Sequence, residues 1–297
     1  METPVMHGII PILPTPFHAD GTLDLEPYGS LIDFAVASGV AAVGVPAFGS
    51  EFYKLDAGER GEILTRVLAL AKGRVPVMVQ CNHACGAKAA AMARHAESIG
   101  AAVVNTALPR TFTSDPRALL DFSRQVCYAT SLPVVIQDWN PGGPTIGLDF
   151  IRALHRDCPN FRYVKLEEGG IGELVRAIRE ETGGAVQVLS GWGGLYLPEL
   201  AASGIAGIVP GMSLIDRFRR LWDCVESADW ATLDAGFAEI LPFISLSLRN
   251  LEQFHHAEKT LLHKRGILPN AVVRDVTVPM DSDATDYLLR LVGRFVK

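Results

Sequence analysis

The sequence lacks the features that mark several classes of protein. None of its apolar runs is long enough to span a bilayer, and it has no lysine- or arginine-rich block to provide the basic surface that nucleic-acid binding requires. The first residues, METPVMHG, contain no basic segment followed by an apolar run, so we predict no secretion signal. These absences argue against membrane and nucleic-acid partners, and we expect a cytoplasmic protein.

Cysteine is also scarce, and its five positions are Cys81, Cys85, Cys127, Cys158 and Cys224. An odd number of mostly distant cysteines predicts reduced thiols rather than a disulfide framework. Only the segment QCNHAC brings metal-ligating residue types together, at Cys81, His83 and Cys85. Their spacing does not match a common zinc site, so we expect no metal.

The composition is that of an ordinary globular protein. Hydrophobic residues make up 48% of the chain, charged residues make up 20%, and the formal net charge is −6. The 297 residues are too many for an average domain, but they suit a single α/β barrel of about 250 residues or more. We therefore expect one large core.

Short apolar runs alternate with longer segments of helical pattern. Eight runs have the character of strands: 8–13, 41–46, 75–80, 101–106, 132–138, 162–167, 186–190 and 205–210. They are apolar nearly throughout, as parallel strands covered on both faces must be. Eight strand–helix repeats predict an α/β fold, a (β/α)8 TIM barrel.

The strand pattern fades after about residue 211. Three helical stretches follow, at 212–225, at 229–264 with a break around Pro242, and at 283–296. We expect a catalytic barrel domain at 1–225 and a C-terminal helical extension at 226–297. Because no low-complexity linker separates them, the extension should pack against the barrel or against a neighbouring subunit.

The segment FRYVKLEEGG (161–170) places a lysine in a predicted strand. Since alternate strand residues share a face, Tyr163, Lys165 and Glu167 should point together into the barrel, near the carboxyl ends where barrel active sites lie. Burial favours the neutral, nucleophilic form of an amine, so Lys165 is a candidate to form an imine with a carbonyl substrate. The alternative is a Lys165–Glu167 ion pair that only fills the interior, and the residues alone leave both interpretations open.

Several motifs resemble those of one family, in the right order and at the right separations. They are PTPFHADGTLD (14–24), GSEFYKLDAGER (49–60), GRVPVMV (73–79), GAAVVNTALP (100–109), VKLEEG (164–169) and GIAGIVPG (204–211). With them the chain resembles, from end to end, the dihydrodipicolinate synthase and N-acetylneuraminate lyase family of class I Schiff-base lyases. The resemblance implies a barrel with a helical tail, a homotetramer or dimer, a small-molecule 2-keto acid substrate, and a covalent imine with Lys165 in place of a cofactor.

Three segments depart from the family pattern. Phe48 and Gly49 stand where the family usually shows two hydroxyl residues, and Arg110 and Thr111 stand in the place of an aromatic pair. Gln137 and Asp138 replace a Tyr-Asn pair whose tyrosine commonly moves protons. An amide cannot serve as a general acid or base near neutral pH, so the synthase reaction is disfavoured.

The same departures resemble the L-2-keto-3-deoxyarabonate dehydratase-like branch of the family. That branch has Gln-Asp after the fifth strand, a Phe-Ser-Glu type loop, and a Lys-x-Glu strand whose glutamate acts as the acid and base. The resemblance implies that Lys165 makes the imine, that Glu167 moves the protons, and that the reaction is dehydration of a 2-keto-3-deoxy sugar acid.

The candidate substrate-binding residues are Gly49, Ser50, Glu51, Arg110, Gln137, Asp138, Gly191 and Ile208. In the family, the loop containing the first three binds the substrate carboxylate, and its N–H groups could form an anion-binding nest. Ser50 has the alternative of a plain turn residue. Arg110 could bind a polar tail of the substrate or face solvent, and Asp138 could orient a substrate hydroxyl or cap the following loop.

Two other functions stay open from the sequence. A pyruvate-dependent aldolase or a synthase-like condensation would use the same imine, and release of pyruvate would distinguish the aldolase. A non-catalytic keto-acid-binding barrel is the other alternative, since a fold can outlive its function. The loss of the tyrosine favours this alternative, whereas the presence of Lys165 and Glu167 opposes it. His255 and His256, on a C-terminal helix, are expected at the surface or at an interface.

Overall fold

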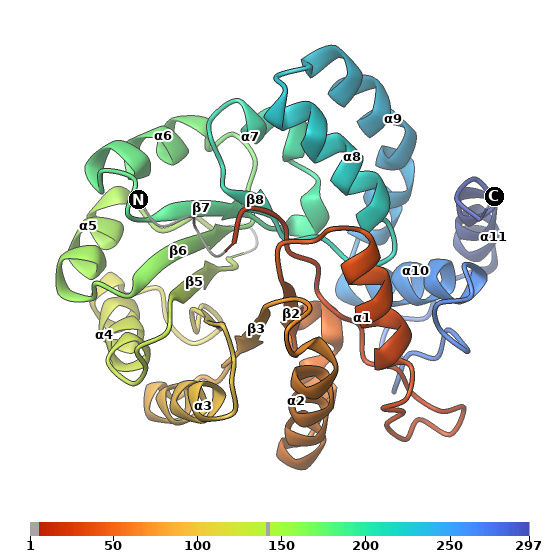
Figure 1. The fold of residues 1–297 in the computed structure, drawn as a ribbon, viewed down its shortest axis with the longest axis horizontal. Coiled ribbons are helices and arrows are strands. Elements are labelled where there is room, and N and C mark those ends of the chain that lie inside the picture. The colour runs from red at the N-terminus through yellow and green to blue at the C-terminus, as the bar shows by residue number, and fades with distance from the viewer. Residues whose placement is uncertain (1–5, 141–142, 297) are drawn as a thin grey trace. The chain divides into compact units, whose positions relative to one another are not determined.

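The computed structural model describes residues 6–140 and 143–296 (Figure 1). The chain divides into two compact units. Of the described residues, unit 1 contains Met6, His7 and those within Pro76–Val209, and unit 2 contains Gly8–Val75 and those from Pro210 to Val296. The predicted boundary between residues 225 and 226 stays a prediction.

Unit 1 is a parallel sheet whose strands are joined by helices. Its strands are β3 (Val77–Gln80), β4 (Val103–Ala107), β5 (Val134–Asp138), β6 (Phe161–Leu166), β7 (Gln187–Ser190) and β8 (Gly207–Ile208), and consecutive strands pair in parallel. The connecting helices are α3 (Gly86–Ser98), α4 (Pro116–Cys127), α5 (Leu148–Asp157), α6 (Gly172–Glu181), η3 (Trp192–Gly194) and α7 (Leu197–Ala201). The strands are buried nearly throughout, as their apolar sequences predict.

Unit 2 contains two strands and a larger number of helices. These elements are β1 (Gly8–Ile9), α1 (Tyr28–Ala37), β2 (Val43–Val45), η1 (Phe48–Ser50), η2 (Phe52–Lys54), α2 (Ala57–Ala71), α8 (Ile215–Glu226), α9 (Trp230–Ser247), α10 (Leu251–Lys264) and α11 (Ser282–Val292). Asp56 and Glu59 begin α2 with a reciprocal capping box, which satisfies N–H groups that the first helical turn leaves unpaired.

The predicted break around Pro242 is wrong. Helix α9 runs through Pro242, although a proline there removes one helical hydrogen bond. The helix ends at Ser247, and the next helix begins where the Asn250 side chain accepts a hydrogen bond from the Gln253 N–H. The break is therefore set by the helix cap at Asn250.

All eight predicted strands are present, each overlapping its predicted range. The predicted alternation of strand and helix is therefore confirmed up to β8.

None of the helices among the described residues is long and apolar enough to cross a membrane.

Candidate active site

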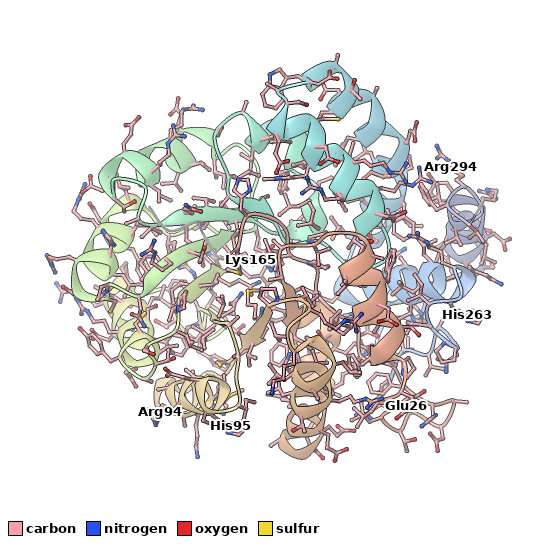
Figure 2. All side chains as sticks on the ribbon, viewed as in Figure 1. Glu26, Arg94, His95, Lys165, His263 and Arg294 are labelled. Atoms are coloured by element: carbon pink, nitrogen blue, oxygen red, sulfur yellow. The ribbon has the colours of Figure 1, made fainter. Side chains whose placement is uncertain are left out.

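Lys165 lies near the carboxyl end of β6 (Figure 2), and Glu167 directly follows this strand. Lys165 Nζ lies 3.1 Å from Glu167 Oε1, and the two side chains are only 8% and 7% exposed. The two-residue spacing on an extended strand brings both to one face, as predicted. The pairing itself is confirmed, and the catalytic roles of the two residues stay a prediction.

The Glu167 carboxylate is held from three directions. Its Oε1 accepts a 2.7 Å hydrogen bond from Gln137 Nε2 in addition to the contact with Lys165. Its Oε2 accepts a hydrogen bond from the backbone N–H of Trp192. Both carboxylate oxygens are therefore oriented by donors on β5, on β6 and after β7.

Gly191 is the residue that lets the backbone after β7 approach this carboxylate. A Cβ added at Gly191 would lie 1.9 Å from Glu167 Oε2, a distance that no side chain permits. The next residue, Trp192, has a φ of 45°, in the left-handed region that non-glycine residues seldom adopt. Gly191 was predicted as a substrate contact and lies beside the candidate base. The part played by the Trp192 N–H could not be predicted, because it depends on the backbone rather than on the side chain.

Arg110 and Asp138 bind each other. Arg110 Nε and Nη2 donate to the two Asp138 oxygens at 2.7 and 2.8 Å, and the Asp138 side chain is 1% exposed. Asp138 also accepts from Thr145 Oγ1 and from the Ile146 N–H, so it caps the following loop. Burial raises the pKa of the nearby Glu168 carboxyl, and the negative charge of Asp138 adds to the rise. Substrate contact by Arg110 and Asp138 stays a prediction.

The predicted carboxylate-binding loop lies in unit 2, where its groups bond to one another. The Ser50 hydroxyl donates to the Leu13 carbonyl at 2.6 Å and accepts from the Ala47 N–H at 3.0 Å. The Ser50 and Glu51 N–H groups donate to the carbonyls of Ala47 and Phe48. Ser50 thus serves as a turn residue, and a role for Gly49, Ser50 and Glu51 in substrate binding stays a prediction.

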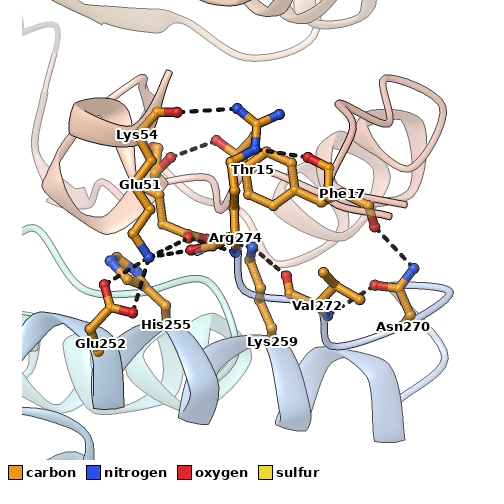
Figure 3. A network of polar contacts seen from close by, with 12 residues as sticks. Thr15, Phe17, Glu51, Lys54, Glu252, His255, Lys259, Asn270, Val272 and Arg274 are labelled. Atoms are coloured by element: carbon orange, nitrogen blue, oxygen red, sulfur yellow. Dashed lines mark hydrogen bonds and ion pairs between the residues drawn. The ribbon is translucent and has the colours of Figure 1, made fainter. Parts of the chain in front are cut away.

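Glu51 is the centre of a buried ionic cluster (Figure 3). It is 0% exposed, and its Oε1 lies 2.5 Å from Lys259 Nζ. Its Oε2 accepts from Lys54 Nζ at 3.2 Å and from the Arg274 N–H at 3.2 Å. Burial lowers the pKa of Lys259 to about 8, against the opposing attraction of Glu51.

His255 belongs to the same buried region, so its predicted surface position is wrong. The residue is 1% exposed, and its Nε2 lies 3.0 Å from the Tyr53 hydroxyl. Burial, together with the positive charges of Lys259 and Lys54, lowers the pKa of His255 to about 2. His255 lies on the face of α10 that packs toward the ionic cluster. The spacing of residues along the helix did not predict which side of α10 is buried.

The strand register places Gln80 and Asn105, which the sequence did not predict as site residues, on the face of the sheet that carries Gln137 and Lys165. Gln80 pairs with Asn105, and Gln137 pairs with Lys165. Asn105 pairs with Val135, two residues before Gln137, so all these side chains share one face of the sheet. The sequence signal that could have identified Gln80 and Asn105 is the presence of a polar amide inside an otherwise apolar strand.

Two further predicted positions can be placed. Ile208 is a buried residue of β8 that pairs in register with Ser190. In the QCNHAC segment, Cys81 is buried whereas Cys85 is exposed. Across residues 6–140 and 143–296, no group of three histidine, cysteine, aspartate or glutamate side chains is arranged to hold a metal ion.

Known proteins resemble this chain in sequence and in fold. The model of the dihydrodipicolinate synthetase family matches residues 5–294. L-2-keto-3-deoxyarabonate dehydratase from Azospirillum brasilense is 26% identical over 299 residues, which cover 99% of this chain and 96% of the relative. An Escherichia coli (strain K12) protein named "probable 2-dehydro-3-deoxy-D-pentonate aldolase" is 30% identical over 132 residues, 44% of each chain.

Among solved structures, dihydrodipicolinate synthase from Rhodopseudomonas palustris aligns with a TM-score of 0.90 and 26% identity, over 98% of each chain. The predicted fold class is thereby confirmed: a (β/α)8 TIM barrel with additional C-terminal helices.

Proposed function

Because the chain belongs to the dihydrodipicolinate synthetase family, we propose that it is a Schiff-base lyase that dehydrates a 2-keto-3-deoxy sugar acid. The observation that carries this proposal is the buried pair of Lys165 and Glu167, with Gln137 at the position where a tyrosine would otherwise move protons. The match to the A. brasilense dehydratase over nearly the whole chain supports the choice of reaction.

The first step is imine formation at Lys165. A lysine ammonium must lose a proton before it can attack a carbonyl, and Glu167 Oε1 lies 3.1 Å away as the acceptor. The neutral amine adds to the C2 carbonyl of the substrate. Glu167 then returns the proton to the hydroxyl group of the resulting carbinolamine, which leaves as water, so that a protonated imine forms and Glu167 is again a carboxylate.

The second step is elimination, with Glu167 as base and then as acid. The protonated imine acidifies the C3 hydrogens, and Glu167 removes one of them to give an enamine. The electrons of the enamine expel the C4 hydroxyl, which leaves as water with the proton from Glu167. Gln137 has no proton to exchange near neutral pH, so its part is to hold the carboxylate in place through its 2.7 Å hydrogen bond.

An aldolase is the second candidate, because cleavage of the C3–C4 bond would proceed through the same imine. The E. coli relative named as an aldolase favours it, although that match covers only 44% of this chain. Release of pyruvate from a 2-keto-3-deoxy acid would identify the aldolase, whereas its absence together with loss of water would identify the dehydratase.

Borohydride trapping tests the imine directly. The protein is incubated with a 2-keto-3-deoxy acid or with pyruvate, reduced, digested and examined by mass spectrometry. We expect a reduced adduct on the peptide that contains Lys165. The Lys259→Arg variant is the matched control, since it removes a buried lysine of unit 2 and should still be labelled at Lys165. Absence of the adduct at Lys165 would rule out the Schiff-base mechanism.

A further inference from the structure

The amide side chains of Gln80, Asn105 and Gln137 lie on the face of the sheet that carries Lys165. Gln80 is the last residue of β3, Asn105 lies two residues before the end of β4, and Gln137 lies one residue before the end of β5. The strand register puts them on the same face as the lysine. They therefore lie near the carboxyl ends of their strands, where barrel enzymes bind substrate.

These amides are buried but incompletely bonded. Gln80 is 1% exposed and Asn105 is 0% exposed. Within the part of the chain that the structure describes, Gln80 Oε1 and Nε2, Asn105 Oδ1 and Gln137 Oε1 have no hydrogen-bond partner. Burying a polar atom without a partner is unfavourable, so folded proteins keep such atoms mainly where water or a ligand completes them.

The chemistry of the open atoms selects a ligand class. Each amide oxygen accepts a hydrogen bond, and Gln80 Nε2 donates. A hydroxyl group can both donate and accept, so it fits all of these atoms. A carboxylate can only accept and would face three amide oxygens, and an apolar chain would leave every one of the open atoms unpaired.

We propose that Gln80 and Asn105 form a hydroxyl-binding subsite that makes this enzyme select polyhydroxylated 2-keto acids. The inference rests on the proposed function and names the residues that recognise the hydroxyl groups of its substrate. Gln137 links the subsite to the chemistry, because its Nε2 holds Glu167 while its buried Oε1 has no hydrogen-bond partner among the described residues. Neither Gln80 nor Asn105 takes part in proton transfer, so they act on substrate selection.

The test replaces the amides with apolar side chains of similar size, in Gln80→Met and Asn105→Leu. We expect kcat/KM for a 2-keto-3-deoxy sugar acid to fall about 10-fold in each variant, as expected for one lost hydrogen bond. Borohydride trapping of pyruvate, which has no hydroxyl group, should stay within about two-fold of the wild type. The Tm should hold or rise, because unpartnered buried amides are removed.

Gln187→Met is the matched control. Gln187 also has a buried amide oxygen without a partner among the described residues, and it pairs in register with Tyr163 on the same face. It lies at the amino end of β7, away from the reacting end, so its replacement should leave kcat/KM unchanged. An equal loss in Gln187→Met, an equal loss with pyruvate, or no loss in either subsite variant would overturn the proposal.

A second measurement separates this inference from the proposed function. If the wild type dehydrates no sugar acid, calorimetric binding of a polyhydroxylated 2-keto acid is compared with binding of 2-ketopentanoate. A preference of about 10-fold for the hydroxylated ligand, lost in Gln80→Met, would support the subsite even though the reaction assignment had failed. Equal binding of the two ligands would reject it.

Discussion

Each unit contains a buried lysine–glutamate pair, Lys165–Glu167 in unit 1 and Lys259–Glu51 in unit 2, and these two pairs differ in how fully they are bonded. In unit 2, Lys259 Nζ contacts Glu51 Oε1 at 2.5 Å and the Val272 carbonyl at 2.8 Å, and it lies 4.5 Å from the centre of the Phe17 ring. In unit 1, Lys165 Nζ forms one ion pair among the described residues, with Glu167. A lysine ammonium has three donors, so Lys165 keeps capacity that Lys259 has used.

The surroundings of the two pairs differ in the same way. Glu51 binds the side chains of Lys54 and Lys259 and the Arg274 backbone N–H. It thereby connects η2, α10 and the segment that follows α10. Around Lys165, the amides of the shared face retain open donors and acceptors. A saturated buried pair is expected to support the fold, whereas a pair among open polar atoms is expected to act on a ligand.

Glu167→Gln should give the largest effect on activity. Replacing the carboxylate with an amide removes the proton acceptor but keeps the size of the side chain. We expect turnover to fall about 10²- to 10⁴-fold, whereas pyruvate should still be trapped at Lys165 after a longer incubation, because water can also accept the proton that the amine must lose. Steady-state kinetics and mass spectrometry of the reduced adduct measure the two quantities. Glu168→Gln, at the neighbouring position, is the control and should change turnover less than about two-fold. If Glu167→Gln were as active as that control, the assignment of the base would fail.

Glu51→Ala should give the largest effect on stability. It leaves the Lys259 ammonium buried without its carboxylate, a change that typically costs about 3–5 kcal/mol. Urea unfolding measures the loss. The double variant Glu51→Ala, Lys259→Met should recover part of it, because no uncompensated charge remains. Glu62→Ala, at an exposed position of α2, should shift the unfolding free energy by less than about 0.5 kcal/mol. A loss no larger in Glu51→Ala than in this control would remove the distinction between the two pairs.

The fold could be predicted from the sequence because its signals are local and repeated. Each of the eight apolar runs contains or overlaps a strand, and the run containing Lys165 had the alternation that brings Lys165 and Glu167 together. The break in the C-terminal helices was misplaced because proline was weighed as a helix breaker, whereas the Asn250 cap decides where α10 begins.

The parts of the site that escaped prediction depend on contacts between distant segments. The Trp192 N–H reaches Glu167 only because of backbone conformation. The pairing of Arg110 with Asp138 joins the loop after β4 to the end of β5, and sequence spacing does not encode it. The open amides at Gln80 and Asn105 became evident only from the strand register and from the accounting of hydrogen bonds.

The smallest expected effect concerns His255, and it tests whether a histidine beside the ionic cluster of unit 2 can be protonated in the folded protein. Burial lowers the pKa of His255 to about 2, so between that value and its unfolded value of about 6.5 the unfolded chain binds a proton that the folded protein cannot. Stability due to this group is therefore present above pH 6.5 and is lost as the pH falls. From pH 7 to pH 5 the wild type should lose about 2 kcal/mol of unfolding free energy that His255→Gln does not lose. Urea unfolding of both proteins at the two pH values measures the difference, in which the remaining histidines cancel. Equal losses in the two proteins would mean that His255 can be protonated in the folded protein. The contrast between the two lysine–glutamate pairs would then rest only on the hydrogen bonds of Lys259 and Lys165.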